Sequence, residues 1–371
     1  MFGYSISSDV FGGDRLIIGA PFQNESGVAY ICSDSSSCLV DDPASMSAFI
    51  PRSMYGATNH WINSEEYISC QPRFHVMHWC NPVLHQCVES PRRPGPQWLR
   101  QMFVTGRCYI KNERRNTVHI FEKCDYDEQT AYAKMCTSKG AGFSLAMLDS
   151  SRLVVSNPLN RYQQGSIGLI SGSRSPPQLT STSATFDDFF TSNPAALHKL
   201  PRSLFPTCGG ESEDERNRCR SRIVANFDHS HFGMALAAFG SSGLLVGSPH
   251  RYRTQLAGSV SFYPVRGEEV APFEQWFLDS SRFVDGRQMG ELFGWSVAVG
   301  DFNNDGHLDV AIGAPTWSKK NEVNLGRVYI FIGPNKEDRW AQYVAIQGTH
   351  PGKQFGASLF IKDVDNGKNY V

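Results

Sequence analysis

The sequence has no excess of charge and no long hydrophobic run. Its 35 Lys and Arg residues are matched by 36 Asp and Glu residues, which gives a formal net charge of −1. A chain without a basic field is not expected to bind nucleic acid, and no acidic tail is present. No apolar run reaches the ~18 residues that a membrane span requires.

Catalytic motifs are also missing. No nucleophile elbow, phosphate-binding loop or paired-acid motif stands out in the sequence. We therefore expect a protein that is not an enzyme. The chain is instead rich in Gly and Pro, with 33 and 20 residues, and in aromatic residues. This composition is typical of many short strands joined by tight turns.

The chain contains ten cysteines, an even number, and most of them form close pairs along the sequence. The close pairs are Cys32 with Cys38, Cys80 with Cys87, Cys124 with Cys136, and Cys208 with Cys219. Such pairing indicates disulfides in an oxidising compartment. A glycosylation acceptor at Asn24 is compatible with secretion. Because no signal peptide opens the chain, we expect the sequence to be a fragment of an extracellular protein.

The stretch "HVMHWCNPVLHQC" at 75–87 offers three His and two Cys, which would suggest zinc in a cytosolic protein. Because the other cysteines are paired, a disulfide between Cys80 and Cys87 is the preferred interpretation.

A repeat of two strands and a turn runs through the whole chain. Each copy starts near an anchor glycine and ends in a small residue and Pro, as in "FGYSISSDVFGGDRLIIGAP" and "FGWSVAVGDFNNDGHLDVAIGAP". A third strand, with the alternation of a half-buried strand, follows in several copies. The anchors are Gly3, Gly56, Gly142, Gly233, Gly294 and Gly356, and the third strands lie at 27–32, 165–172, 258–265 and 326–333.

Repeats of a few strands, tens of residues apart, predict an all-β fold of the β-propeller type. An array of β-sandwiches is the alternative, but such domains rarely fit into about 60 residues. Two of the intervals are longer, and we expect the excess, at 73–100 and 173–231, to be inserted loops. The second includes "SPPQLTSTSATF", whose Ser and Thr content predicts a mobile segment.

The predicted blade boundaries follow from the anchors. We expect blade 1 at 2–50, blade 2 at 51–139, blade 3 at 140–230 with the long insert 173–231, blade 4 at 232–290, blade 5 at 291–350, and the start of blade 6 at 351–371.

The fifth copy carries five extra residues in its hairpin turn. Three copies span 16 residues from anchor glycine to closing proline, whereas Gly294 to Pro315 spans 21. The added loop places oxygen donors at alternate positions, a pattern that suits Ca²⁺. The predicted ligands are Asp301, Asn303, Asp305, the backbone carbonyl of His307, and Asp309. An Asn/Asp-rich turn without metal is the alternative.

The loop differs from a helix–loop–helix calcium hand, because Ile312 stands where that hand requires Glu. We therefore expect a calcium loop between two strands. The sixth copy, "DVDNGKNYV" at 363–371, offers Asp363 and Asp365 as a candidate second metal site. Gly367 stands at its third side-chain position, and no acid follows.

The FG…GAP repeat with a DxNxDGxxD loop inside its hairpin resembles the N-terminal propeller of integrin α subunits. The resemblance covers essentially the whole chain and extends to "GRCYI" at 106–110 and to "SCQP" in the second copy. It implies a seven-bladed propeller, of which this sequence holds about five blades and the start of a sixth. The interval of 86 residues between Gly56 and Gly142 leaves no room for the ligand-binding domain that some members insert there.

The resemblance implies three disulfides, with two more as loop staples. The implied pairs are Cys32–Cys38, Cys70–Cys108 and Cys124–Cys136, and the staples are Cys80–Cys87 and Cys208–Cys219.

The resemblance also implies a ligand-binding face. Tyr162 stands at the family's aromatic position on the blade 3 loop, and Asp228 stands at the acid before blade 4. Ala131 stands near the other family acid, which disfavours a bidentate acidic clamp for a ligand arginine. Ordinary loop residues are the alternative for Tyr162 and Asp228.

A β subunit is implied on the same face, with a basic side chain that enters the central channel of the propeller, which is ringed by aromatics. Cation–π contact would explain such a ring, and plain core packing is the alternative. The residues just after the anchor glycines line this channel: Tyr4, Phe143, Met234 and Trp295.

By resemblance, the chain is part of a cell-adhesion receptor subunit at the extracellular side of the plasma membrane. The full-length form would be a single-pass type I glycoprotein, joined to the membrane through segments absent from this sequence. It would form a heterodimer with an integrin β subunit, bind an extracellular-matrix protein, take part in integrin-mediated signalling and hold structural Ca²⁺. The alternative is a secreted propeller of the same repeats attached to an enzyme such as a phospholipase.

Overall fold

The structure is a computed structural model, and the elements of its described part are β-strands joined by turns. It describes residues 5–8, 15–21, 23, 27–33, 37–41, 55–81, 86–89, 92–113, 117–121, 143–149, 152–158, 165–171, 178–182, 230–241, 243–251, 256–266, 269–270, 283–333, 343–363 and 369–370. None of these residues belongs to a helix that is long and apolar enough to cross a bilayer.

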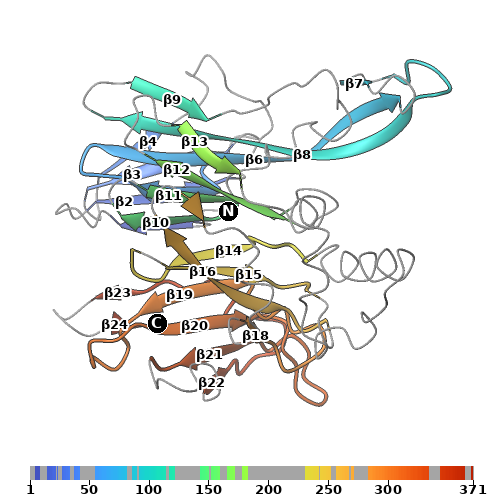
Figure 1. The fold of residues 1–371 in the computed structure, drawn as a ribbon. Coiled ribbons are helices and arrows are strands. Elements are labelled where there is room, and N and C mark those ends of the chain that lie inside the picture. Colours follow the sequence, from blue (N-terminus) through green and yellow to red (C-terminus); the bar gives the residue numbers. More distant parts are fainter. Residues whose placement is uncertain are drawn as a thin grey trace, which may run out of the picture. The chain divides into compact units, whose positions relative to one another are not determined.

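Three antiparallel sheets come first along the chain, and in each the strands follow one another in sequence order (Figure 1). The first sheet contains β1 (Ser5–Ser8), β2 (Leu16–Ala20), β3 (Val28–Cys32) and β4 (Cys38–Asp41). The second contains β5 (Thr58–Trp61), β6 (Glu66–Asn81), β8 (Leu99–Asn112) and β9 (Thr117–Phe121), with β7 (Gln86–Glu89) paired to β6. The third contains β10 (Leu145–Asp149), β11 (Arg152–Asn157), β12 (Ser166–Ser171) and β13 (Gln178–Thr182).

Two further sheets and a short hairpin follow. The fourth sheet contains β14 (Ala235–Ala238), β15 (Gly243–Ser248), β16 (Ser259–Arg266) and β17 (Glu269–Val270), with β18 (Phe283–Asp285) paired to β16. The fifth contains β19 (Ser296–Gly300), β20 (Asp309–Ala314), β21 (Arg327–Phe331) and β22 (Val344–Gln347). The hairpin pairs β23 (Lys362–Asp363) with β24 (Asn369–Tyr370).

This architecture confirms the predicted fold class: the described part is an all-β chain of small antiparallel sheets, as expected of a partial β-propeller. The inner strands form where the repeat pattern predicts them, except β8, the third strand of the second sheet, for which the pattern gave no third strand. The reason is burial: the second strands "GLLVGS" and "DVAIGA" are buried at every position, because both of their neighbours and both faces are covered. The chain divides into two compact units, residues 1–161 with 170–179 and residues 162–169 with 180–371.

Consecutive sheets are joined by a repeated backbone contact. The glycine before the third strand forms a parallel bridge to the aromatic residue that opens the next repeat, as in Gly258 with Phe293 and Gly326 with Phe355. These glycines have positive φ, and a Cβ on Gly326 would lie 2.1 Å from the carbonyl oxygen of Phe355. Only glycine fits such a position, so the join explains why each repeat keeps one there.

A second contact accompanies the first at three of the joins. The second strand of a repeat contains a glycine that packs against the anchor glycine of the next repeat. The carbonyl oxygen of that anchor glycine occupies the space that a Cβ on the strand glycine would need. A Cβ on Gly247 would lie 2.0 Å from the oxygen of Gly294, and a Cβ on Gly313 would lie 2.0 Å from the oxygen of Gly356. Gly247 and Gly313, which begin the segments Gly-Ser-Pro and Gly-Ala-Pro, therefore let the two backbones approach closely.

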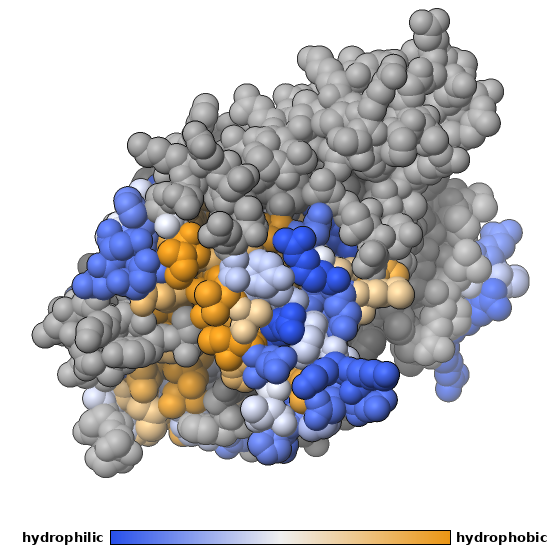
Figure 2. All heavy atoms as spheres, turned by 90° about the horizontal axis from the view of Figure 1, so that it is seen from below, coloured by the Kyte–Doolittle hydropathy of each residue, from blue (hydrophilic) through white to orange (hydrophobic). Residues whose placement is uncertain are grey.

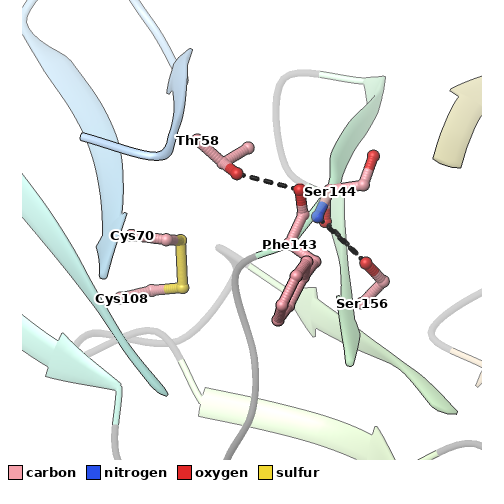
Figure 3. The surroundings of a disulfide bond; sticks show 6 residues. All are labelled: Thr58, Cys70, Cys108, Phe143, Ser144 and Ser156. Atoms are coloured by element: carbon pink, nitrogen blue, oxygen red, sulfur yellow. Dashed lines mark hydrogen bonds between the residues drawn. A yellow bond between two sulfur atoms is a disulfide. The ribbon is translucent and has the colours of Figure 1, made fainter. Parts of the chain in front are cut away.

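The second and third sheets are joined through a side chain as well (Figure 3). The Thr58 hydroxyl donates a hydrogen bond to the Phe143 carbonyl oxygen at 2.9 Å. The neighbouring Ser144 backbone N–H donates to the Ser156 hydroxyl oxygen at 3.0 Å. These bonds fix the first turn of the third repeat against β5.

A buried polar cluster joins the first and second sheets. The hydroxyls of Tyr55 and Tyr67 both donate to Asp41 Oδ2, at 2.6 and 2.9 Å. The Lys111 ammonium pairs with Asp41 Oδ1. Burial, followed by the charge of Asp41, raises the pKa of both tyrosines, so the hydroxyls stay protonated as donors. The carboxylate is thereby fully partnered, which is the condition for burying a charge at low cost.

Two expectations about the inserts are wrong. Residues 73–100 are not a plain loop, because β6 and β8 continue into them and β7 lies within them. The segment "SPPQLTSTSATF" contains β13, so its residues 178–182 are an edge strand. Alternating β-branched and aromatic residues favour strands in the first case, and Thr residues do so in the second.

Each complete sheet also has a fourth, outer strand that the repeat pattern does not predict. β4 and β22 are examples, and β22 is exposed at every position. A strand that buries neither face needs no hydrophobic alternation, so its sequence carries little signal. Figure 2 views the molecule from the side on which β22 lies in Figure 1 and shows apolar and polar side chains interspersed there. Val344 and Ile346 of β22 are 59% and 46% exposed.

Candidate functional site

The candidate calcium loop is the turn between β19 and β20, residues 301–308. Two left-handed residues shape it: Asn304 has a φ of 58° and Gly306 has a φ of 81°. Asn is one of the few non-glycine residues that adopts this conformation readily. Residues 303–307 are exposed, so the tip of the loop is open to solvent.

Side-chain oxygens of the loop gather on a small set of backbone N–H groups. The N–H of Asp305 donates to Asp301 Oδ1 and to Asn303 Oδ1, at 3.1 Å in both cases. The N–H of Gly306 donates to Asp301 Oδ2 at 2.8 Å. The structure thus brings the first three predicted side-chain ligands, Asp301, Asn303 and Asp305, into one hydrogen-bonded turn.

Asp305 is held in its ionised form. The Asn303 amide donates to Asp305 Oδ2 at 2.9 Å, and the His307 N–H donates to Asp305 Oδ1 at 2.8 Å. The first of these bonds, followed by the second, lowers the pKa of Asp305 from its ordinary value. The carboxylate is therefore charged and exposed at neutral pH.

Asp309 lies at the base of the loop and is fully buried. Its Oδ2 accepts a hydrogen bond from the Phe302 N–H at 2.7 Å, and its Oδ1 accepts one from the Gly333 N–H at 2.6 Å. Phe302 follows β19 and Gly333 follows β21, so one carboxylate ties the ends of two strands to the start of β20. Sequence reasoning assigned Asp309 to the metal and missed this clamp, because Gly333 is remote in sequence.

The loop fits Ca²⁺ in its donor chemistry. Three carboxylates, one amide and one backbone carbonyl supply hard oxygen donors, and each carboxylate oxygen has a further lone pair beside its present hydrogen bond. Within the described residues, no three His, Cys, Asp or Glu side chains already surround a common point. The fit therefore rests on the donor set and the exposed turn.

The other predicted site residues have different outcomes. Asp363 lies in β23 opposite Asn369, and Asp365 lies outside the described residues. Tyr4, Tyr162, Asp228 and the sequon residue Asn24 also lie outside them. The predicted proximity of the two ligand-contact residues, Tyr162 and Asp228, therefore stays a prediction.

Phe143, Met234 and Trp295 are described, and each is partly exposed. Met234 and Trp295 share one local structure: their N–H groups donate to the carbonyls of His231 and Leu292, at 3.0 and 3.1 Å. His231 and Leu292 are left-handed residues with φ of 54° and 58°. The turn thus places Met234 and Trp295 in equivalent positions after their anchor glycines.

A buried carboxylate that sequence reasoning missed lies just before the fifth anchor. Glu291 is 0% exposed, and its Oε2 accepts a hydrogen bond from the Tyr329 hydroxyl at 2.7 Å. Its Oε1 accepts from the backbone N–H groups of Arg287 and Gln288. Glu291 therefore organises the turn that leads into the anchor. The only signal in the sequence is an acid two residues before the FG pair.

Two predicted disulfides are present. Cys32 bonds Cys38 within the first sheet, and Cys70 bonds Cys108 across β6 and β8 (Figure 3). The register places Cys80 opposite Cys87, so their disulfide stays a prediction with a compatible backbone. Cys124, Cys136, Cys208 and Cys219 lie outside the described residues.

The glycine joins recur between neighbouring sheets, as is typical of a protein built from repeats. The FG-GAP repeat family profile matches residues 293–331, which hold β19, the loop, β20 and β21. The chain is 28% identical to integrin alpha-PS2 of Drosophila melanogaster over 62% of this chain and 16% of that protein. It is 25% identical to human integrin alpha-IIb over 96% of this chain and 33% of that protein.

These similarities relate the chain to the N-terminal propeller of integrin α subunits. The chain spans between about a sixth and a third of the length of these relatives. A shorter match, 32% identical over 19% of this chain, is to human phosphatidylinositol-glycan-specific phospholipase D, of which it covers 9%. The integrin α matches cover more of this chain than the phospholipase D match does.

Proposed function

We propose that this chain is the ligand-facing propeller of an integrin-type α subunit, which pairs with a β subunit and helps to bind a matrix protein. The similarity to integrin alpha-IIb over 96% of the chain carries the proposal. The five sheets would be blades 1–5 with the predicted boundaries, and the β23–β24 hairpin would belong to blade 6. Pairing, adhesion and signalling would be properties of the whole protein.

The proposed β-subunit contact uses the residues after the anchor glycines. Met234 and Trp295 are partly exposed at equivalent turns, which suits a surface that receives a basic side chain of the partner. Phe143 follows its own anchor, and Tyr4 would complete the set. Large apolar and aromatic side chains at the centre of an interface commonly dominate its binding energy.

Pairing is tested by co-precipitation of the full-length product with β subunits from its own cells. We expect the double variant Met234→Ala/Trp295→Ala to reduce recovery of the β chain at least tenfold, since losing one such anchor costs about 2 kcal/mol or more. The matched control, Val344→Ala/Ile346→Ala, removes two exposed apolar side chains from β22 and should leave recovery unchanged. Equal recovery with both variants would contradict the proposed contact.

Failure to recover any β chain with the unaltered protein would overturn the pairing itself. It would favour the alternative, a secreted FG-GAP propeller attached to an enzyme, which the partial match to the phospholipase D supports. The full-length product would then be examined for a catalytic region.

We also propose that Asp301, Asn303, Asp305, the His307 carbonyl and Asp309 hold a structural Ca²⁺. The ion would add oxygen–metal bonds to a turn that hydrogen bonds already close, and so stiffen the hairpin. Asp363 and Asp365 remain a weaker candidate pair in the last hairpin. The proposed ligand contacts of Tyr162 and Asp228, and glycosylation at Asn24, rest on the family resemblance and on the sequon alone.

Calcium binding is tested by the melting temperature with Ca²⁺ and with chelator. For a Kd on the order of 10⁻⁴ to 10⁻³ M, about 10 mM Ca²⁺ should stabilise the protein by about 1.4–2.7 kcal/mol. Asp305→Ala should abolish most of this difference, yet change the chelated protein little, because its side chain is exposed. Mg²⁺ at the same concentration is the control. An Asp305→Ala protein with a full calcium response would show that the ion binds elsewhere.

A further inference from the structure

Three turns at one end of the fifth sheet form a continuous surface within the second compact unit. The first turn, 286–292, leads into β19, the second, 316–325, joins β20 to β21, and the third, 348–354, follows β22. β20 begins at the candidate calcium loop and ends at the second turn, so this surface lies at the other end of the strand from that loop. We call these residues the three-turn surface.

Side-chain hydrogen bonds join the first turn to the second. The Gln288 amide donates to the Ser318 carbonyl oxygen at 2.9 Å, and its side-chain oxygen accepts from the Ser318 N–H at 2.8 Å. The Thr316 hydroxyl donates to the Gly290 carbonyl oxygen at 2.6 Å. These bonds hold the two turns against each other.

Backbone hydrogen bonds join the second turn to the third. The Gly352 N–H donates to the Val323 carbonyl oxygen at 3.0 Å, and the Gln354 N–H donates to the Asn324 carbonyl oxygen at 3.1 Å. The second turn therefore lies between the other two, and the chain itself fixes all three. A preformed surface lowers the entropic cost of binding a partner.

The three-turn surface is basic, although the whole chain carries a net charge of −1. Four exposed cations belong to it: Arg287, Lys319, Lys320 and Lys353. Among the residues that the structure describes, none of the four forms an ion pair. Their charges are therefore available to a partner from outside the sheet.

The two acids of the surface compensate this charge only in part. Glu291 is buried, and its carboxylate is occupied by the hydrogen bonds described above. Glu322 is partly exposed and pairs through its backbone with Lys319 across a two-residue turn. Asn321 gives that turn its left-handed φ of 67°, and the tip presents Lys320. One partly exposed acid thus opposes four cations.

Two apolar side chains are exposed among these cations. Met289 in the first turn is 68% exposed, and Val323 in the second is 66% exposed. An interface commonly combines apolar side chains at its centre with a charged rim. The three-turn surface has both parts, so its chemistry suits a protein partner with carboxylates and an apolar side chain.

Arg327 adds a further positive charge where the second turn enters β21. Its Cζ lies 3.5 Å from the centroid of the Trp317 ring, and the side chain is partly exposed. Its Nε has no hydrogen-bond partner within the described part of the chain. A guanidinium held flat on an aromatic ring is oriented for a carboxylate, which accepts two of its N–H groups at once.

We propose that the three-turn surface binds an acidic segment of an extracellular protein, with an apolar side chain of that segment packed against Met289 or Val323. The cations require an anionic partner, and the exposed apolar side chains favour a protein over a sulfated polysaccharide, which presents no apolar side chain. The disulfides place the chain in an oxidising compartment, whereas the anionic leaflet of the plasma membrane faces the cytoplasm. The proposal depends neither on a β subunit nor on calcium.

The test measures binding of the whole chain to a fluorescent peptide in which one leucine is flanked on each side by three acidic residues. At physiological salt, Lys319→Gln/Lys320→Gln should weaken binding about fivefold or more, because two charge contacts are lost. Met289→Ser/Val323→Ser should weaken it about tenfold or more, because apolar burial is lost. Glu322→Gln should strengthen it about twofold, because the opposing acid is removed.

The matched controls change exposed residues elsewhere: Val344→Ser/Ile346→Ser on β22, and Arg92→Gln before β8. Each should bind within about twofold of the unaltered protein, since a balanced chain has no general basic field. Every variant should melt at the unaltered temperature, and Lys319→Arg/Lys320→Arg, which keeps the charge, should retain binding. Equal losses in the control and surface variants would overturn the proposal.

Further probes separate the possible occupants. A peptide with serine in place of leucine should bind about fivefold more weakly or less tightly still, and chelator should leave binding unchanged below the melting temperature. Binding of a heparin-type sulfated polysaccharide without binding of the peptide would show a purely electrostatic surface, and the proposal would be wrong. A lysine variant that keeps peptide binding but no longer recovers the β chain would assign the surface to subunit pairing, which also overturns it.

Discussion

Replacing Asp309 with alanine is expected to lower the free energy of unfolding by about 3–5 kcal/mol, with or without calcium. The carboxylate is fully buried and accepts backbone N–H groups from Phe302 and Gly333. Alanine would leave both N–H groups without this partner, and the β19, β20 and β21 ends would lose their shared tie. Denaturant unfolding followed by tryptophan fluorescence measures the change, first in chelator and then in Ca²⁺.

Two variants make this result specific. Asp309→Asn keeps one acceptor oxygen and should lose about half as much, whereas Asp305→Ala should cost little in chelator because it lies on the surface. A loss for Asp309→Ala that is seen only in Ca²⁺ would contradict the clamp and return Asp309 to a purely metal-binding role. A loss below about 1 kcal/mol in both conditions would contradict both roles.

Replacing Gly313 with alanine is expected to destabilise the fifth sheet by about 3 kcal/mol or more. A Cβ there would lie 2.0 Å from the Gly356 carbonyl oxygen and 2.2 Å from Ser296 Oγ. Neither atom can move freely, because the Ser296 hydroxyl itself donates to that carbonyl at 2.6 Å. The expected readout is a large fall in melting temperature, with faster cleavage by protease.

The matched control is Gly306→Ala in the loop. No atom lies within 4 Å of a Cβ at Gly306, although its φ of 81° is unfavourable for alanine. The cost should therefore be limited to about 1–2 kcal/mol of backbone strain. If Gly313→Ala were as mild as Gly306→Ala, the close approach of the two backbones would not be a determinant of stability.

The repeat pattern predicts the inner strands well because buried strands have a recognisable local pattern of hydrophobic residues. Buried runs such as "AIGAP" and alternating runs such as "GRVYIF" appear in every complete copy, and the loop of the fifth copy stands out as an insertion. The outer strands β4 and β22 are not predictable in this way. They are held by hydrogen bonds to one neighbour and bury little, so their side chains are under weak constraint.

The site shows the same division between local and remote determinants. The alternating donors of residues 301–305 are visible in sequence because their turn is local. The partner of Asp309 at Gly333 and the partner of Glu291 at Tyr329 are brought in by the fold, so neither bond could be read from spacing. The extension of β6 was missed because residues 73–100 were interpreted as an inserted loop, and its pairing partner β8 is remote in sequence.

The glycine joins have a consequence for biosynthesis. Gly27 bridges to Tyr55, Gly258 to Phe293, and Gly326 to Phe355, so each join needs only the start of the repeat that follows it. Contacts between residues this close in sequence form early and lose little chain entropy. A sheet can therefore complete its interface as soon as the next few dozen residues leave the ribosome. At these three joins the order of synthesis and the order of assembly coincide, whereas the join of Gly165 to Phe232 has to wait for the longer segment between them.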